Sequence, residues 1–407
     1  MTDHTRLDVC LACGGTRLTP YLDLGAQPLA NSYHDGKTPL DAYPLGVNLC
    51  GDCFHTQLTV AVDPDLMFRN YLYVSGTTST LANYFADFVL RAERDLGTGR
   101  PLRVLDIASN DGSLLEKFRL RGHVVQGVDP AENLRPLSEA KGVPTMVSYW
   151  NEDARARSGG GFDVIVAMNV LAHITYPAEF LGLCRRALAP GGRIYIQTSQ
   201  AMMVKNGEFD TIYHEHHSFF TVRSFLALAA RAGLSVVEIE HVPVHGMSYL
   251  VRLTAAAGGA AALNVSEFAV GQAEMAAGYY DIKTYEQFAS RALATRDKVS
   301  ELVAWSRAAG YTVGGYGAAA KGMTFLNFAS LDLDYIIDDN PMKVGLLTPG
   351  RDIRVVGPEH LEQDGSNTVF VILAWNFYEE IMRRIQARRN NARDYYLTYF
   401  PRVNLVG

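Results

Sequence analysis

Residues 102–113 read Leu102-Arg103-Val104-Leu105-Asp106-Ile107-Ala108-Ser109-Asn110-Asp111-Gly112-Ser113. The first half is a short apolar run, which is typical of a buried parallel strand. The second half is small and polar and predicts a loop, and residues 114–120 predict a helix. A second strand is expected at residues 123–128, directly before Asp129. Strand, loop, helix and strand in this order predict a doubly wound α/β sheet whose ligand lies at the carboxyl ends of its strands.

The alternation of strands and helices continues along the chain. A helix expected at residues 178–188 ends at Pro190-Gly191-Gly192, a turn that is common in class I methyltransferases. Two late strands should close the sheet in antiparallel orientation. The further strands are expected at residues 162–167, 193–198, 235–240 and 249–253. We therefore expect residues 71–258 to form a Rossmann-like domain.

The loop after the first strand indicates which cofactor this domain binds. It lacks the G-x-G-x-x-G pattern of a dinucleotide site, because only Gly112 is a glycine. Asp129, about 20 residues on, suits a ribose diol, which fits NAD or S-adenosylmethionine. The missing glycines and the acid Asp106 favour S-adenosylmethionine, whose positive end needs acids nearby. The expected contacts are Asp106, Ala108, Ser109, Asn110, Gly112, Ser113, Asp129 and Asn169.

Four of the five cysteines form two C-x-x-C pairs, Cys10-Leu11-Ala12-Cys13 and Cys50-Gly51-Asp52-Cys53. Two such knuckles can bring four thiolates to one tetrahedral Zn²⁺. Four protein ligands leave no open position, so the zinc would be structural and would stabilise a small module at residues 1–70. Two disulfides are the alternative, which a reducing compartment disfavours. His55 is a further candidate ligand, and Cys184 is expected to be a core thiol.

A second polar cluster lies at residues 209–220, Phe-Asp-Thr-Ile-Tyr-His-Glu-His-His-Ser-Phe-Phe. Three imidazoles beside a phenol and a carboxylate are suited to moving protons. A partly satisfied core cluster or a chance metal site are the alternatives. Residues 71–78, Tyr71-Leu72-Tyr73-Val74-Ser75-Gly76-Thr77-Thr78, carry hydroxyls that could line a polar pocket or cap a helix at residues 81–96.

Residues 259–407 predict a second α/β unit. Helical patterns fill residues 265–309, and residues 312–322 read as a strand, a small-residue loop and a helix start. The helix N-terminus and Lys321 favour a phosphate group, which predicts that Lys321→Ala raises KM more than it lowers kcat. The alternative is that the small residues permit close packing. Asn376 follows a strand expected at residues 368–375 and is a second candidate for the substrate.

Charge and hydropathy exclude several classes of partner. The chain has 407 residues and a net charge of −6, without a long basic run. We therefore expect no nucleic-acid partner and no membrane-surface partner. No apolar run approaches the roughly 20 residues that span a bilayer, and residues 1–6 do not resemble a signal peptide. A cytoplasmic protein is expected, as a monomer or small oligomer.

Several motifs together resemble the sugar C-methyltransferases of deoxysugar biosynthesis. They are the two cysteine knuckles, Tyr-x-Tyr-x-Ser-Gly at 71–76, Asp-Ile-Ala-Ser-Asn-Asp-Gly-Ser at 106–113, Asn-Val-Leu-Ala-His at 169–173 and Glu-Phe-Asp-Thr-Ile-Tyr-His-Glu-His at 208–216. The resemblance covers nearly the whole chain. It implies transfer of a methyl group from S-adenosylmethionine to a carbon next to the 4-keto group of a TDP-linked 4-keto-6-deoxysugar. C-3 is the expected carbon, and C-5 stays open.

Carbon methylation through an enolate needs a base, an oxyanion donor and an aligned methyl group. His216 is the expected base, Glu215 its orienting carboxylate and Tyr213 the donor to the enolate oxygen. The resemblance also implies that His173 and Tyr73 face the sugar, although His173 can be read as a satisfied strand-end histidine. Tyr71, Ser75, Lys321 and Asn376 are the further expected substrate contacts. The C-terminal unit would hold the nucleotide diphosphate.

The sequence departs from the family pattern at two positions, and three rival functions stay open. His217 stands where the family has an apolar residue, and Met247 replaces a glycine of a His-Gly-Gly-Ser motif. An O- or N-methyltransferase would need only an aligned nucleophile, which makes the His/Glu/Tyr cluster superfluous. A nucleic-acid methyltransferase conflicts with the acidic charge and with Met-Asn-Val-Leu at residues 168–171. A zinc-bearing protein that senses S-adenosylmethionine is the non-enzymatic alternative.

Overall fold

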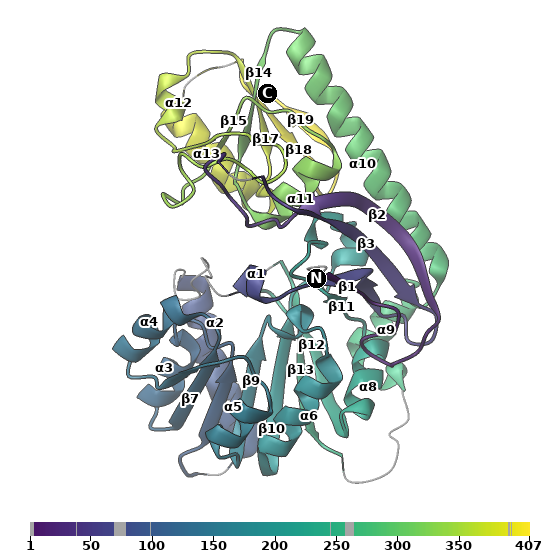
Figure 1. Cartoon of the computed structure of the whole chain (residues 1–407), viewed down its shortest axis with the longest axis vertical. Coiled ribbons are helices and arrows are strands. Elements are labelled where there is room, and N and C mark those ends of the chain that lie inside the picture. Colours follow the sequence, from purple (N-terminus) through teal and green to yellow (C-terminus); the bar gives the residue numbers. More distant parts are fainter. Residues whose placement is uncertain are drawn as a thin grey trace.

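The computed structural model describes residues 4–37, 39–68, 79–97, 99–244, 246–256, 264–389, 391 and 393–407. Within these residues the strands form sheets of two, four, six and seven strands. Figure 1 shows the seven-stranded sheet and its helices in the lower half and the six-stranded sheet in the upper half, with the long strands β2 (Leu18–Pro28) and β3 (Ala42–Cys50) between them. The predicted domain boundaries near residues 70 and 258 both fall in segments outside the described residues, so the division into three domains stays a prediction.

The lower sheet has the order β12-β13-β10-β9-β6-β7-β8. Its strands are β6 (Arg103–Ile107), β7 (Val124–Asp129), β8 (Thr145–Val147), β9 (Phe162–Met168), β10 (Leu188–Thr198), β12 (Leu234–Val242) and β13 (Ser248–Ala255). The five strands from β10 to β8 are parallel. β13 is antiparallel to both of its neighbours, β10 and β12, so of the two late strands predicted to be antiparallel only β13 runs against the rest of the sheet, and β12 has the direction of the five parallel strands. The chain runs from β6 outward to β7 on one side and later to β9 on the other. This reversal creates a crevice at the carboxyl ends of the strands.

Helices cover both faces of this sheet. They are α2 (Ser79–Leu96), α3 (Ser113–Leu120), α4 (Arg135–Ala140), α5 (Glu152–Ser158), α6 (Pro177–Ala187) and α8 (Val222–Arg231). Phe85 and Phe88 of α2 and Phe118 of α3 share one buried cluster with Val104 of β6, because helical spacing places their rings on the faces toward the sheet. The predicted helix at 178–188 ends at Ala187, and β10 already includes the Pro-Gly-Gly turn behind an irregularity in its pairing with β9.

The N-terminal module consists mainly of strands. They are β1 (His4–Arg6), β2 (Leu18–Pro28), β3 (Ala42–Cys50), β4 (Thr56–Leu58) and β5 (Val60–Val62), followed by the short helix α1 (Asp65–Phe68). β11 (Ser218–Phe219) comes from the histidine-rich segment and pairs with β4, which gives the sheet order β11-β4-β3-β2. The histidine-rich segment therefore continues directly into an edge strand of the N-terminal sheet.

The upper sheet has the order β16-β15-β14-β17-β18-β19, and only β19 is antiparallel to its neighbour. Its strands are β14 (Thr312–Tyr316), β15 (Tyr335–Ile337), β16 (Val355–Val356), β17 (Thr368–Ile372), β18 (Tyr395–Thr398) and β19 (Asn404–Val406). Its helices are α11 (Ala320–Phe328), α12 (His360–Gln363) and α13 (Tyr378–Arg388). The helical segment predicted at 265–309 divides into α9 (Ala269–Ala276) and α10 (Ile282–Ala308) around Gly278, whose φ is +76°.

Two glycines of the β14–α11 loop are used for close packing. A Cβ added at Gly317 would overlap the Cβ of Ala374, and one added at Gly322 would lie 2.7 Å from the Cβ of Leu373. The loop therefore lies directly on the chain that leaves β17. No helix in the described ranges combines the length and the hydropathy of a membrane span.

Candidate active site

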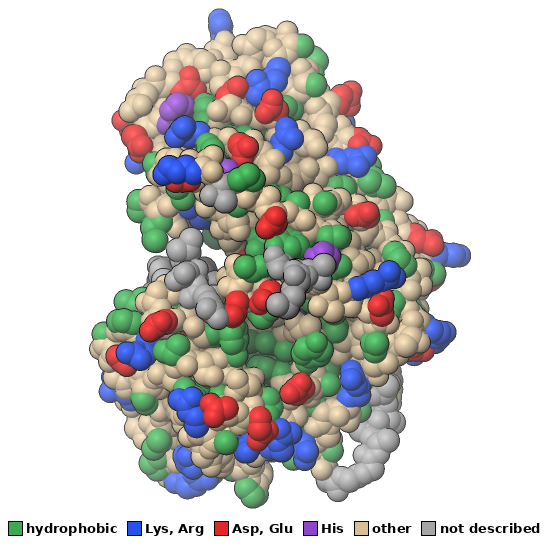
Figure 2. Space-filling model, in the orientation of Figure 1, with side chains coloured by type: hydrophobic (Ala, Val, Ile, Leu, Met, Phe, Trp, Pro, Cys, Tyr) green, Lys and Arg blue, Asp and Glu red, His purple; other side chains and the backbone are tan. Residues whose placement is uncertain are grey.

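A cavity of about 1000 Å³ lies at the carboxyl ends of the lower sheet. Figure 2 shows hydrophobic side chains gathered around a hollow below the middle of the molecule. Four parts of the chain contribute to the lining. Thr5, Asp63 and Phe68 come from the N-terminal module, and Asn110, Asp129 and Asn169 come from the strand ends and following loops of the lower sheet. Tyr213 and His216 come from the histidine-rich segment, and Lys321 comes from α11. The cavity thus brings cofactor candidates and catalytic candidates together.

Four of the eight predicted cofactor contacts line this cavity: Ala108, Asn110, Asp129 and Asn169. Asp129 accepts hydrogen bonds from the backbone N–H groups of Asn110 and Ala131, both at 2.8 Å, while burial raises its pKa. Ala108, Asn110 and Asn169 have positive φ values of 57°, 52° and 57°. Non-glycine residues rarely adopt this conformation, and they concentrate at ligand sites.

The other four predicted contacts lie outside the lining and support the loop from below. Asp106 is buried, and its burial and the neighbouring Asp129 raise its pKa well above the usual value. Ser109 packs closely against Gly127, because a Cβ added at Gly127 would overlap the Oγ of Ser109. A Cβ at Gly112 would lie 3.0 Å from that of Ser138, and Ser113 donates to Asp111 at 2.8 Å.

His216 is held as one tautomer by its hydrogen bonds. Its Nδ1 lies 2.8 Å from the carbonyl oxygen of Thr211, and its Nε2 lies 3.1 Å from the hydroxyl of Tyr213. A carbonyl oxygen only accepts, so Nδ1 carries the proton and Nε2 presents its lone pair, to which the Tyr213 hydroxyl donates. The lone pair of a buried imidazole is thus directed beside a phenol in the cavity.

Gln200 also faces the Nδ1 of His216, with its amide nitrogen at 2.9 Å. Two donors cannot bond to each other, and the Oε1 of Gln200 has no partner within the described part of the chain. Exchanging the amide oxygen and nitrogen removes this conflict, because the oxygen then accepts the Nδ1 proton. Gln200 was not singled out in the sequence; its φ of 77° marks it only in the structure.

The imidazoles of His216 and His173 are both neutral near pH 7. Burial, aided by the nearby His173, lowers the pKa of His216 well below its usual value, and burial lowers the pKa of His173 to about 4. Their ring centroids lie 4.9 Å apart, and both rings line the cavity. A neutral imidazole is the form that can accept a proton.

Glu215 and His214 point away from this pair. Glu215 accepts a hydrogen bond from Asn31 at 2.6 Å, and burial raises its pKa to about 7. The groups that orient the Nδ1 of His216 are therefore Thr211 and Gln200, in place of the expected Glu215. His214 bonds through Nε2 to the backbone oxygen of Tyr43 in β3.

Lys321 reaches the cavity from the C-terminal unit. Its Nζ lies 5.1 Å from the ring centroid of Trp375. The Nε1 of Trp375 donates to Asp210 at 2.7 Å, and the hydroxyl of Tyr399 donates to the same carboxylate oxygen at 3.1 Å. Burial raises the pKa of Asp210 to about 6. Asn376 is exposed and lies outside the lining.

Some site residues that the sequence predicts are not found in the cavity lining, either because they lie outside the described residues or because they lie elsewhere in the structure. Tyr71, Tyr73 and Ser75 lie outside the described residues. Met247, which replaces a family glycine, has a φ of 99° and does not line the cavity. Residues that the sequence did not indicate, and that line the cavity, include Asp63, Phe68, Trp150 and Ser199.

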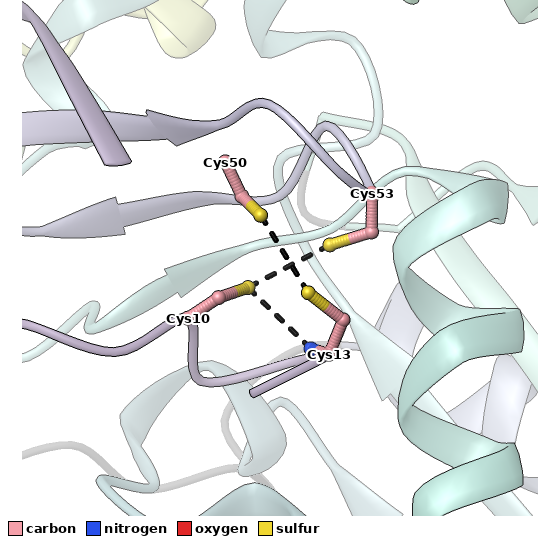
Figure 3. A group of neighbouring side chains, drawn as sticks. All are labelled: Cys10, Cys13, Cys50 and Cys53. Atoms are coloured by element: carbon pink, nitrogen blue, oxygen red, sulfur yellow. Dashed lines mark hydrogen bonds between the residues drawn. The ribbon is translucent and has the colours of Figure 1, made fainter. Parts of the chain in front are cut away.

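Cys10, Cys13, Cys50 and Cys53 converge at one point, with all four Sγ atoms within 4.8 Å of one another (Figure 3). The Cys10–Cys53 and Cys13–Cys50 sulfur distances are 3.6 and 3.5 Å. A tetrahedron of Zn–S bonds of about 2.3 Å has edges of about 3.8 Å, so the four thiolates fit Zn²⁺. His55 is not part of this cluster; its Nε2 lies 3.2 Å from the Oγ of Ser218.

Three family models match successive parts of the chain. Residues 10–68 match a zinc-binding domain, residues 78–239 a methyltransferase domain, and residues 243–401 the C-terminal domain of C-methyltransferases. The first of these models contains all four clustered cysteines, and the second contains the sheet residues that line the cavity.

Relatives and solved structures match over different lengths. The C-methyltransferase NovU of Streptomyces niveus is 30% identical over 398 residues, which cover 94% of this chain and 93% of that protein. A ubiquinone biosynthesis O-methyltransferase of Ruegeria pomeroyi is 32% identical over 36% of this chain and 66% of its own. The crystal structure of magnesium protoporphyrin IX methyltransferase from Synechocystis PCC 6803 with bound S-adenosylmethionine is 14% identical, covers 43% of this chain and 79% of that one, and has a TM-score of 0.34.

Proposed function

This chain belongs to the S-adenosylmethionine-dependent C-methyltransferases, and on that premise we propose that it methylates a ring carbon next to the 4-keto group of a TDP-linked 4-keto-6-deoxysugar. C-3 is the preferred carbon and C-5 the alternative. The observation that carries the proposal is the arrangement of His216, whose unprotonated Nε2 accepts a hydrogen bond from Tyr213 in the cavity that the cofactor candidates also line.

A carbon-bound proton has a high pKa, and its removal needs both a base and a group that stabilises the resulting enolate. His216 takes the proton on Nε2 while Thr211 and Gln200 hold Nδ1 in place. The Tyr213 hydroxyl, released from Nε2 as the proton arrives, can then donate to an oxygen of the sugar. Asn110, Asp129 and Asn169 would hold the methyl donor, which supplies the electrophilic carbon.

A rival O- or N-methyl transfer has less support. It requires an aligned nucleophile and no carbon base, so it leaves the His216–Tyr213 pair without a role. The O-methyltransferase relative also matches only 36% of this chain, whereas the C-methyltransferase relative matches 94%. We assign the C-terminal unit to binding the TDP half of the substrate, across the cavity from the methyl donor.

The test is a mass spectrum taken after incubation with the methyl donor and a panel of TDP-4-keto-6-deoxysugars in deuterated water. A product heavier by one methylene unit, together with exchange of the C–H next to the ketone for deuterium in the remaining substrate, supports the proposal. His216→Asn should abolish the deuterium incorporation, and His360→Asn, in α12 and outside the lining of the cavity, serves as the imidazole control. Methylation on oxygen or nitrogen without carbon exchange would refute the proposal.

A further inference from the structure

We propose that Lys321 is a catalytic residue: its ammonium group stabilises the enolate oxygen that forms when His216 removes the carbon-bound proton. The inference rests on the proposed function and goes beyond it, because it assigns the cation that balances the charge of the intermediate. The sequence alone favours a phosphate group as the partner of Lys321. Three features of the structure favour the enolate instead.

The first feature is the position of Lys321 in the cavity. It is the single Lys or Arg among the described residues that line the cavity, and it lines it together with Tyr213 and His216. The acidic side chains of the same lining are Asp63, Asp129 and Glu179. An enolate formed here would meet repulsion from these carboxylates, and a fixed cation near the reacting carbon offsets that repulsion.

The second feature is the support of the lysine side chain. The Trp375 ring lies beneath the Nζ at 5.1 Å, and the indole N–H is fixed by Asp210 at 2.7 Å. Asp210 lies at 0% exposure and also accepts from Tyr399. Trp375 and Asp210 are therefore positioning residues, which hold the ammonium group ready before charge develops. A group that needs no reorganisation during the reaction stabilises a transition state best.

The third feature is the loop before Lys321, which is poorly suited to hold a phosphate. The N–H of Ala318 already donates to Asp338 at 2.7 Å, and its carbonyl accepts from Tyr33 at 2.6 Å. Ala374 and Leu373 already occupy the space beside Gly317 and Gly322. A phosphate cradle needs free backbone N–H groups and room for oxygens, and the N–H groups of Gly317 and Ala318 and the space beside Gly317 and Gly322 are already used within the protein.

The charges balance through the whole step. The C–H bond breaks, its proton goes to the Nε2 of His216, and its electron pair forms a carbon–carbon double bond. The π pair of the ketone moves onto the oxygen, which lies next to the ammonium group of Lys321. The pair of the carbon–carbon double bond then forms the new bond to the methyl carbon, while the bond from that carbon to the sulfonium sulfur of the methyl donor breaks and its pair goes to sulfur, which leaves a neutral thioether. The pair on oxygen returns and restores the ketone. Lys321 keeps its proton throughout.

The experiment measures deuterium exchange at the substrate carbon without the methyl donor, together with the Kd for TDP alone. Lys321→Met keeps the length of the side chain and removes the charge. We expect the saturating exchange rate to fall by about 10²-fold, with the Kd for TDP unchanged within twofold, and partial recovery in Lys321→Arg. Lys298→Met removes an exposed lysine of α10 that pairs with Glu301, and it should match the wild-type protein in both measurements.

Two results would overturn the inference. One is a tenfold or greater rise in the Kd for TDP with the saturating exchange rate intact, because Lys321 would then bind phosphate. The other is an unchanged exchange rate in Trp375→Phe and in Lys321→Met, because the positioning then has no effect on the reaction. Absence of exchange in the wild-type protein with every sugar is a different result: it refutes the proposed function itself and removes the basis of the inference.

Discussion

Gly317→Ala tests whether the C-terminal unit depends on close packing at the β14–α11 loop. Gly317 has a φ of +93°, and a Cβ there would overlap that of Ala374 and lie 3.0 Å from its backbone nitrogen. Gly310, directly after α10, has a similar φ of +84° and has no atom within 4 Å of an added Cβ. The two glycines therefore differ in packing and share the backbone conformation.

The expected magnitude follows from this difference. An alanine in the left-handed region costs about 1–2 kcal/mol, and the reduced freedom of the unfolded chain returns about 0.4–1 kcal/mol. Gly310→Ala should therefore lower the free energy of unfolding by roughly 1 kcal/mol. Gly317→Ala carries the same change and adds about 1–3 kcal/mol for overpacking against backbone atoms that cannot rotate away. The excess of the second variant over the first measures the packing alone.

Urea unfolding followed by tryptophan fluorescence gives the comparison, because Trp375 lies one residue beyond the contact at Ala374. Gly317→Ala should shift the midpoint clearly more than Gly310→Ala. It should also lower the exchange activity, since any displacement of Ala374 moves the ring beneath Lys321. Equal midpoint shifts in both variants would refute the packing argument. Glycine would then be required at position 317 only because of its positive φ.

Three further predictions concern the proton transfer, the zinc site and a buried carboxylate. Burial lowers the pKa of His216, so its Nε2 stays unprotonated at more acidic pH than in a free imidazole. The deuterium exchange rate should therefore stay level as the pH falls through about 6.5, where a free imidazole takes up its proton. A decline of the rate centred near that pH would contradict the role of His216 as the base. Removal of Zn²⁺ by a chelator, or Cys13→Ser, should lower Tm, whereas Cys184→Ser, outside the cluster, should leave zinc content unchanged when measured by atomic absorption. Burial raises the pKa of Glu274 to about 7, so the folded chain binds this proton more tightly than the unfolded chain, and its contribution to stability falls as the pH rises from about 4.5 to 7. Glu274→Gln, which keeps an acceptor for the Tyr249 hydroxyl, should flatten the dependence of Tm on pH in that window, and an unaltered slope would contradict the raised pKa.

The sequence predicts well those features that depend on short segments. Each C-x-x-C pair sets its own knuckle, and the only long-range requirement is that the two knuckles meet. The cavity edge is also predictable, because the carboxyl ends of parallel strands lie side by side once β6, β7 and β9 share a sheet. That rule identified the loop after β6 and the residues Asp129 and Asn169.

The sequence does not tell which small residue of a loop faces the ligand. Ala108 and Asn110 line the cavity, whereas Ser109 and Gly112 pack beneath it, and all four look equivalent in composition. Contacts between distant segments are also invisible to local patterns. The approach of Lys321 to His216, and the bond between Trp375 and Asp210, depend on how the C-terminal unit sits over residues 209–216.

The pairing of β11 with β4 has a consequence for how this architecture can be recombined. By chain order, Ser218 and Phe219 belong to the methyltransferase half, yet their ladder partners are Gln57 and Thr56. A chimera joined after residue 68 would transplant three strands of this sheet and leave the fourth behind. The exchangeable unit is therefore discontinuous: an exchange of the zinc module that keeps its four-stranded sheet has to include Ser218 and Phe219, which lie about 150 residues further along the chain.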